Sequence, residues 1–244
     1  MTVSFGWGPV EAGALGSGAA CLVVVDVLSF TTAVGVAVEG GAAVHPYRWR
    51  DATAAAYARR AGAALAVGRA EATPEHPWSL SPAALRAAAP LPPRLVLPSP
   101  NGSTIAARAG GTTVIAASLR NRSAVARRLA ERGYGSQDRP LAVIAAGERW
   151  PDGSLRPALE DLLGAGAVLG ALRALTGPDP LTPEATAAAT LWDATEDPVA
   201  ALHGCASGRE LYEYGCPQDV AVAAEIDTST TVPVLVDGAF QEAP

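Results

Sequence analysis

Short apolar runs alternate with longer amphipathic stretches along this chain. Five apolar residues from Cys21 to Val25 lead directly into Asp26, which is the pattern of a strand buried on both faces with a polar residue at its carboxyl end. The next stretch, Phe30–Glu39, has the apolar spacing of a helix. Further strands are expected at residues 42–47, 63–67, 94–97, 113–116, 141–145 and 232–236, and further helices at residues 51–61, 82–88, 123–131, 159–172, 183–191 and 217–224. Strands that alternate with helices predict an α/β fold, here a three-layer sandwich whose largely parallel or mixed central sheet is covered by helices on both faces.

Three proline-rich stretches interrupt this alternation, at residues 74–82, 90–100 and 176–183. None of them is long or polar enough for a flexible linker between domains. The chain also shows no internal repeat. We therefore expect a single domain over residues 1–244.

The composition is that of a globular protein with a large core. Hydrophobic residues make up 49% of the 244 positions and charged residues only 17%. The longest apolar runs are well short of the roughly 20 residues that a membrane span needs. Residues 1–6 lack the positive charge and the apolar stretch of a secretory signal. We expect a cytoplasmic protein with no membrane partner.

The charge balance excludes several mechanisms. Eighteen basic residues face 24 acidic residues, for a formal net charge of −6, and the sequence contains no lysine. Binding to nucleic acid is not expected, because it needs a basic surface. A Schiff-base lysine and a phosphate-binding lysine are excluded as well, so arginine, backbone amides or a metal must bind any anionic group. Cys21, Cys205 and Cys216 lack C-x-x-C spacing and are expected to be reduced thiols.

Polar side chains gather where the predicted strands end. They are Asp26, Glu71, Ser99, Asn101, Ser118, Asn121 and Glu148. Ligands of α/β sheets bind beyond the carboxyl ends of the strands, so these positions indicate a shared site. The alternative is that loops are polar at both edges of a sheet and that Asn101-Gly102 forms an ordinary turn.

Glu160 and Asp161 open the most regular apolar helix of the chain, at residues 159–172. Acids in a first turn interact favourably with the helix dipole, by about 0.3–1 kcal/mol, and this effect alone is one explanation for them. The functional alternative is that they bind a divalent cation together with Asp26, because Mg²⁺ prefers oxygen ligands. The three histidines are isolated along the chain and offer no competing metal motif.

The segment at residues 207–227 is rich in polar residues set among small ones. Ser207-Gly208-Arg209 is expected to form a flexible turn whose guanidinium binds a phosphate or a sulfonate. A surface arginine without a ligand is the alternative interpretation. Asp227 follows the end of a predicted helix, where a carboxylate gains nothing from the helix dipole. This segment is therefore a second candidate for anion binding.

Short sequence tags follow one another over nearly the whole chain. The tags are Val25-Asp26-Val27-Leu28 with Thr31-Thr32; Glu71 with Leu80-Ser81-Pro82; Asn101-Gly102-Ser103; Asn121 with Ser123; Ala146-Gly147; Glu160-Asp161-Leu162-Leu163 with Ala165-Gly166; Ser207-Gly208-Arg209; and Gly215, Asp219, Asp227 and Val232-Pro233. Each tag is weak alone. In their order and spacing, however, they resemble the 2-phosphosulfolactate phosphatase family.

This resemblance implies a Mg²⁺-dependent hydrolase of a small anionic phosphate monoester, such as 2-phosphosulfolactate or a related phosphorylated hydroxy acid. The family is known from coenzyme M biosynthesis. Asp26, Glu160 and Asp161 are the expected metal ligands and, together with Arg209, the expected catalytic residues. The expected substrate-binding residues are Thr31, Thr32, Asn101, Gly102, Ser103 and Ser207. A cation, guanidinium groups and amides suffice for such a reaction, because phosphoryl transfer depends mostly on positioning and on neutralising charge.

A departure from the family's pattern leaves alternatives open. Ser29-Phe30 stands where the family usually has Arg-Ala, so one cation that reads the substrate's acidic group is absent at this point. The alternative function is a non-catalytic binding protein for an anionic metabolite on the same fold. A sugar phosphate or nucleotide substrate is a further alternative. The nucleophile is either a metal-activated water or Asp26 itself, through an aspartyl-phosphate. The oligomeric state stays open, although cytosolic α/β enzymes are often homodimers.

Overall fold

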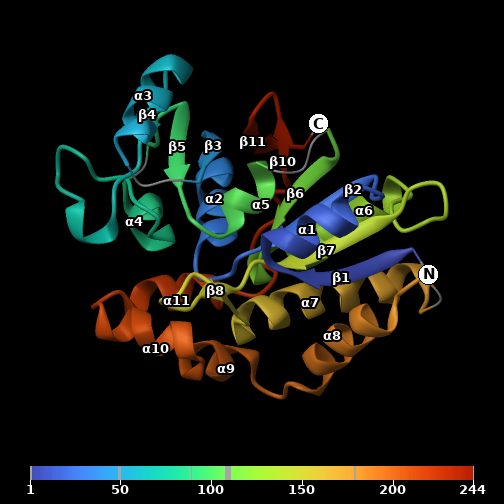
Figure 1. Cartoon of the computed structure of the whole chain (residues 1–244). Coiled ribbons are helices and arrows are strands. Elements are labelled where there is room, and N and C mark those ends of the chain that lie inside the picture. Colours follow the sequence, from blue (N-terminus) through green and yellow to red (C-terminus); the bar gives the residue numbers. More distant parts are fainter. Residues whose placement is uncertain (1, 49–50, 89, 108–110, 179, 244) are drawn as a thin grey trace.

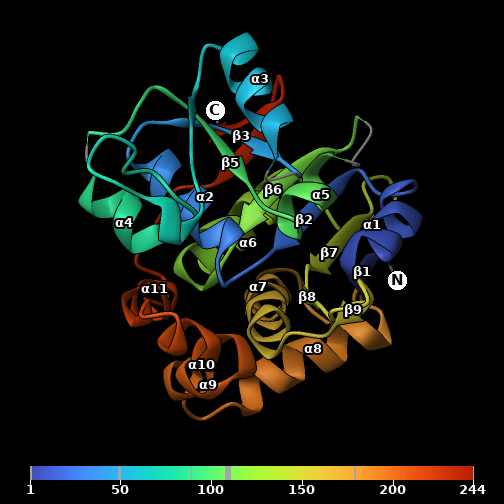
Figure 2. The same ribbon diagram turned by 60° about the vertical axis from the view of Figure 1, so that its left-hand side comes forward.

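A nine-stranded sheet forms the middle layer of the molecule within the part of the chain that the structure describes (Figure 1). The computed structural model describes residues 2–48, 51–88, 90–107, 111–178 and 180–243. Helices cover both faces of the sheet, as the view turned by 60° also shows (Figure 2). The predicted α/β sandwich with a mixed sheet is therefore confirmed.

The strands and helices have the following bounds. The strands are β1 (Val3–Trp7), β2 (Cys21–Val25), β3 (Ala43–Tyr47), β4 (Ala64–Leu65), β5 (Arg94–Pro98), β6 (Thr113–Ala117), β7 (Leu141–Ala145), β8 (Glu148–Arg149), β9 (Leu155–Arg156), β10 (Pro233–Val236) and β11 (Ala239–Glu242). The α-helices are α1 (Gly8–Gly16), α2 (Phe30–Glu39), α3 (Ala52–Ala61), α4 (Pro82–Ala87), α5 (Gly102–Ala107), α6 (Arg122–Glu131), α7 (Leu159–Thr176), α8 (Pro183–Ala194), α9 (Pro198–Gly204), α10 (Ala206–Glu213) and α11 (Pro217–Ala223). Two 3₁₀ helices, η1 (Arg69–Glu71) and η2 (Leu119–Asn121), lie between them.

The sheet consists of two parallel blocks that are joined by a hairpin. Its strand order is β1-β7-β2-β6-β10-β11-β3-β5-β4. Strands β1, β7, β2 and β6 are parallel to one another, and so are β3, β5 and β4. The hairpin β10–β11 pairs antiparallel with β6 on one side and with β3 on the other. The two blocks therefore run in opposite directions. β8 and β9 form a separate antiparallel pair outside this sheet.

The alternation of side chains along the buried strands places a core on each face of the sheet. In β2, Cys21, Val23 and Val25 pack into the core beneath α6, α7 and α8. Leu22 and Val24 point the other way, into the core beneath α1, α2 and α5. This is why β2 is apolar throughout: a strand between two helical layers has no face exposed to water.

One local prediction is wrong, because Ser207-Gly208-Arg209 does not form a flexible turn. These residues lie inside α10, whose N-cap residue Cys205 accepts a hydrogen bond from the amide of Gly208 through its sulfur atom, at 3.2 Å. Gly208 is where α10 comes close to the preceding chain, since a Cβ atom there would lie 2.1 Å from the carbonyl oxygen of Leu202. Arg209 therefore extends from a helix.

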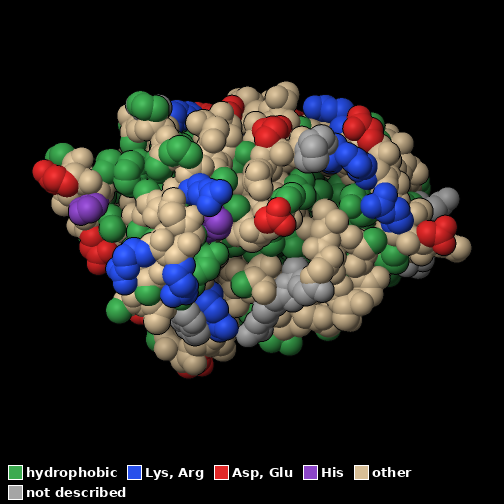
Figure 3. All heavy atoms as spheres, turned by 90° about the horizontal axis from the view of Figure 1, so that it is seen from above, with side chains coloured by type: hydrophobic (Ala, Val, Ile, Leu, Met, Phe, Trp, Pro, Cys, Tyr) green, Lys and Arg blue, Asp and Glu red, His purple; other side chains and the backbone are tan. Residues whose placement is uncertain are grey.

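No helix within the described ranges combines the length and the apolar character that crossing a membrane requires. Figure 3 views the molecule from above, from the side of α3 and the β10–β11 hairpin. Basic side chains form separate groups on this face, with apolar and acidic side chains between them. The face therefore carries charges of both signs.

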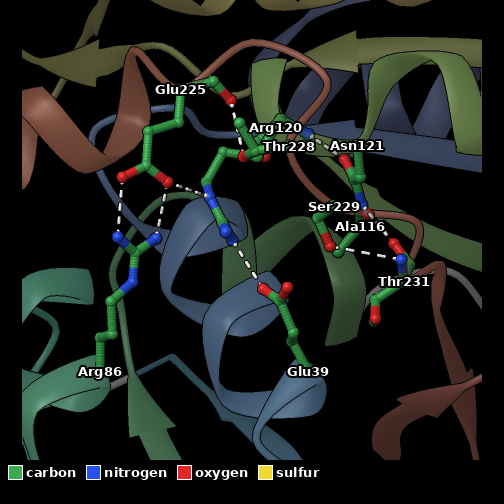
Figure 4. Close-up of polar contacts among 10 residues, drawn as sticks. Glu39, Arg86, Ala116, Arg120, Asn121, Glu225, Thr228, Ser229 and Thr231 are labelled. Atoms are coloured by element: carbon green, nitrogen blue, oxygen red, sulfur yellow. Dashed lines mark hydrogen bonds and ion pairs between the residues drawn. The ribbon is translucent and has the colours of Figure 1, made fainter.

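An ionic network fastens α4 to the body of the molecule (Figure 4). Arg86 on α4 donates two hydrogen bonds of 2.7 Å to the carboxylate of Glu225. The same carboxylate accepts a bond from Arg120, which also contacts Glu39 on α2. The side chain of Arg120 is 6% exposed, whereas that of Arg86 is 45% exposed. Arg120 is therefore the buried centre of the network.

We predict that Arg120→Met lowers the free energy of unfolding by about 2 kcal/mol, because a buried cation between two carboxylates is lost. Arg86→Met removes a largely solvated pair and is the matched control, with an expected loss of less than about 1 kcal/mol. Urea denaturation measures both values. Equal losses in the two variants would contradict the assignment of Arg120 as the central residue.

Candidate active site

Four acidic side chains converge where β2 and β7 end: Asp26, Glu148, Glu160 and Asp161. We call them the carboxylate cluster. Asp161 connects the two strand ends, because its Oδ1 accepts the amide of Val27 at 2.7 Å and its Oδ2 accepts the amide of Gly147 at 2.8 Å. The first turn of α7 supplies Asp161 and Glu160. Both side chains are buried, so they do not serve only as solvated charges at a helix end.

Asp26 lies directly after β2 and is held by two amides. Its Oδ1 accepts the N–H of Phe30 at 3.0 Å, and its Oδ2 accepts the N–H of Gly102 at 2.8 Å. Gly102 can approach this closely because it has no side chain. A Cβ atom there would lie 2.5 Å from the ring of Phe30 and 2.8 Å from Oδ2 of Asp26. Gly102 therefore positions the carboxylate through its backbone.

Glu148 belongs to the cluster, although its place after a strand is the one feature that singles it out in the sequence. The side-chain amide of Asn101 donates to its Oε2 at 2.8 Å. Its charge interacts with those of Asp26 and Glu160, which places it beside them. The signal in the sequence is its position three residues after β7, next to Gly147.

The carboxylate cluster is short of positive charge. Burial raises the pKa of Asp26 to about 6, against the amide hydrogen bonds that lower it. Burial, followed by the charge of Asp26, raises the pKa of Glu148 to about 7. Burial, followed by the charges of Asp26 and Glu160, holds the pKa of Asp161 well above its ordinary value. Each of these shifts means that the folded protein resists ionising the group.

The donor chemistry of the cluster fits a hard divalent cation, because every donor is a carboxylate oxygen. The geometry, however, is not that of an assembled site: the described residues contain no group of three or more His, Cys, Asp or Glu arranged to hold a metal ion. Both oxygens of Asp26 and of Asp161 already accept backbone amides.

A guanidinium from a distant segment lies beside Asp26. Arg69, in η1, donates from Nη2 to the hydroxyl of Ser29 at 2.6 Å and from Nε to Oδ2 of Asp219 at 2.8 Å. Its charge acts on Asp26 and lowers the pKa of that carboxyl against the larger effect of burial. Asp219 is fully buried and also accepts a hydrogen bond from Ser81. The sequence did not point to Arg69, because η1 lies in a segment without regular apolar spacing.

A second arginine flanks the other end of the cluster. Arg156, on β9, forms two hydrogen bonds with Glu210, at 2.7 and 3.1 Å. Its charge lowers the pKa of Glu148, again against the larger effect of burial. Arg69 therefore acts on the cluster at Asp26, and Arg156 acts on it at Glu148.

Several of the expected substrate-binding hydroxyls bond to the backbone. The hydroxyl of Thr31 accepts the amide of Asp26 at 2.9 Å and donates to its carbonyl at 2.8 Å. The hydroxyl of Thr32 donates to the carbonyl of Val27 at 2.8 Å. In the described chain these two threonines thus shape the loop after β2.

Ser103, Ser207 and Arg209 occupy three different environments. The hydroxyl of Ser103 donates to the carbonyl oxygen of Tyr47 at 2.9 Å. Ser207 is buried in α10. Arg209 is exposed and donates to the carbonyl oxygen of Gly204. The structure therefore brings Asp26, Asn101, Gly102, Glu160 and Asp161 together but does not bring Arg209 into contact with them.

A cavity of about 200 Å³ opens beside the carboxylate cluster, and Asn101 and Glu148 contribute to its wall. Four larger cavities, of about 240 to 430 Å³, are lined by residues outside the cluster. Among these five cavities of the described chain, the small one is therefore the one that a cluster residue lines.

Fold and site together define an α/β protein with a buried acidic cluster at the carboxyl ends of two neighbouring parallel strands. A model of the 2-phosphosulpholactate phosphatase family matches residues 11–238. A probable 2-phosphosulfolactate phosphatase of Deinococcus radiodurans is 32% identical over 219 residues, which cover 88% of this chain and 87% of that protein. A protein of the same name from Parasynechococcus marenigrum is 34% identical over 219 residues, covering 86% of this chain and 87% of that protein. The chain belongs to the 2-phosphosulpholactate phosphatase family, as its sequence tags indicated.

We predict that Asp26 and Glu148 make the metal-free protein less stable as the pH rises from about 4 to about 7. The pKa values of Asp26 and Glu148 are raised above their ordinary values of 3.8 and 4.5, so the folded state holds more protons than the unfolded state in this range. The free energy of unfolding contributed by these groups therefore falls with increasing pH.

Glu148→Gln removes one of these titrating groups. It should therefore reduce the decrease in the free energy of unfolding between about pH 5 and about pH 8. Urea denaturation in the presence of a chelator measures the change at both pH values. Glu184→Gln, at an exposed position on α8, is the control and should keep the pH dependence of the parent protein. An unchanged pH dependence in Glu148→Gln would show that Glu148 ionises normally.

Proposed function

We propose that this protein is a magnesium-dependent phosphatase that hydrolyses a small anionic phosphate monoester, 2-phosphosulfolactate or a related phosphorylated hydroxy acid. The observation that carries the proposal is the convergence of four carboxylates and the Arg69 guanidinium at the ends of β2 and β7. The family and the names of the two relatives support the same reaction. The reaction requires groups that bind the phosphoryl oxygens and offset their charge.

Asp26, Glu160 and Asp161 are the residues that would hold magnesium, with Glu148 beside them. When bound, the cation supplies positive charge against the phosphoryl oxygens. The raised pKa values of Asp26 and Asp161 support this assignment, because like charges buried together favour a counter-ion. Amide donors fix the orientation of these two carboxylates before any ligand arrives.

Arg69 is the group that would bind the phosphoryl oxygens directly. Its Nε and Nη2 atoms are fixed by Asp219 and Ser29, while no described residue accepts a bond from Nη1. A guanidinium held in this way keeps its Nη1 atom available to donate to a ligand. It also loses little conformational entropy on binding, because the side chain is already fixed. Asp219 and Ser81 act on the ligand only through Arg69, as positioning residues.

Water is the nucleophile that this arrangement favours. A water oxygen forms a bond to phosphorus, the ester P–O bond breaks, and the alkoxide oxygen of the leaving hydroxy acid takes up the proton that the attacking water loses. Asp26 is the alternative nucleophile, through an aspartyl-phosphate. If Asp26 were the nucleophile, an acid-quenched single turnover with labelled substrate would leave phosphate bound to the chain.

Release of inorganic phosphate from a panel of phosphorylated hydroxy acids, with and without Mg²⁺, tests the proposed function. Asp26→Asn should lower kcat/KM by about 100-fold or more, because it removes a charge that orders the site. Glu184→Gln is the matched control and should leave kcat/KM unchanged. Tight binding of these compounds without release of phosphate under any condition would instead indicate a non-catalytic binding protein.

A further inference from the structure

The cavity beside the carboxylate cluster has two chemically different ends. Asn101 and Glu148 form its inner wall, next to Asp26 and Glu160. The outer part is bounded by α1 and by the β8–β9 hairpin, which lie side by side in Figure 2. Val10 and Leu155 make this outer part apolar. A ligand in the cavity therefore reaches from the acidic cluster to the hairpin.

Arg149 is the only cationic side chain among the described residues that line this cavity. Its Nη1 donates to the carbonyl oxygen of Gly153 at 3.0 Å. Within the described chain, no residue accepts a bond from its Nε or Nη2 atoms. The guanidinium is thus held by one hydrogen bond to the hairpin, and its Nε and Nη2 atoms are available to donate to a ligand.

The hairpin itself is braced, so that it holds Arg149 at the cavity. The amide of Trp150 donates to the carbonyl of Ser154 at 2.9 Å, and the amide of Gly153 donates to the carbonyl of Trp150 at 2.8 Å. Asp152 accepts the amide of Ser154 at 2.9 Å and its hydroxyl at 2.6 Å. On the opposite strand, the two bonds between Arg156 and Glu210 fasten the hairpin to α10.

We propose that the outer part of the cavity is a subsite for a second acidic group of the substrate, a carboxylate or a sulfonate, and that Arg149 binds it. This inference rests on the proposed phosphatase function. A guanidinium presents paired donors that match either group. Glu148 would repel an acid at the inner wall, so the acidic group belongs at the hairpin end and the phosphoryl group at the end near Arg69. The apolar side chains between them suit a short carbon chain.

The test compares two phosphate monoesters that differ only in the acidic group: 2-phospholactate, and isopropyl phosphate, in which a methyl group replaces the carboxylate. The parent protein should prefer 2-phospholactate. Arg149→Gln should lower kcat/KM for 2-phospholactate by about 10- to 100-fold, the effect of losing a charged hydrogen bond. The value for isopropyl phosphate should stay unchanged. Arg149→Lys should retain part of the preference, because it keeps the charge but loses the paired donors.

Arg127→Gln, at an exposed position on α6, is the control and should behave like the parent protein. Thermal unfolding of each variant shows that it is folded. An unchanged preference in Arg149→Gln, or an equal loss for both substrates, would overturn the subsite. If no variant releases phosphate, the proposed function fails, but the subsite is still tested by calorimetric titration with 3-sulfolactate. The parent protein should then bind it at least 10-fold more tightly than Arg149→Gln does, and equal affinities would overturn the subsite.

Discussion

Three buried carboxylates, those of Asp26, Glu160 and Asp161, and the half-buried carboxylate of Glu148 repel one another at the ends of β2 and β7. Asp26 and Asp161 are held in place by backbone amides, and no described cation contacts either carboxylate directly. The four amides belong to Val27, Phe30, Gly102 and Gly147. Amide dipoles offset part of the charge, yet the raised pKa values show that the compensation is incomplete. A bound cation would complete it.

The fold supports the two parts of the site in different ways. Glu160 and Asp161 are carried by α7, an 18-residue helix that packs along the sheet and against α8. Such support fixes the groups that must be positioned most accurately. Arg149 instead lies on a two-residue strand of a small hairpin outside the main sheet. Under the proposed function, the reaction would take place on the rigid core and the second acidic group would be recognised by a short surface element, so that the preferred substrate could change while the reaction stays the same.

The sequence predicted the elements with continuous apolar runs most accurately. β2, α2 and β7 have the bounds that their patterns indicated, because burial on both sides leaves a strong signal. The hairpin β10–β11 turns at Asp237-Gly238, which are favourable residues for a two-residue turn. The sequence predicts the first strand of this hairpin but not the second strand, β11. α5 was missed because Asn101-Gly102 suggests a turn, and β8 and β9 are too short to show a period.

For the site, the sequence could indicate positions but not long-range contacts. The sequence indicates that Asp26, Glu160 and Asp161 lie near one another, because each follows a strand or begins a helix, and the structure brings the three side chains together. Arg69 was missed because its approach to Asp26 depends on Asp219, which lies 150 residues further along the chain. Arg209 was selected on the expectation of a flexible turn, whereas α10 holds it in a helix.

The thermal shift produced by Mg²⁺ in the parent protein and in Glu160→Gln tests whether the carboxylate cluster binds a cation. Mg²⁺ should raise the Tm of the parent protein more at about pH 8 than at about pH 5, because Asp26 and Glu148 are largely protonated at the lower pH. The shift should be much smaller in Glu160→Gln. A shift that is absent, that is equal at both pH values, or that survives in Glu160→Gln would contradict the cluster as a cation site.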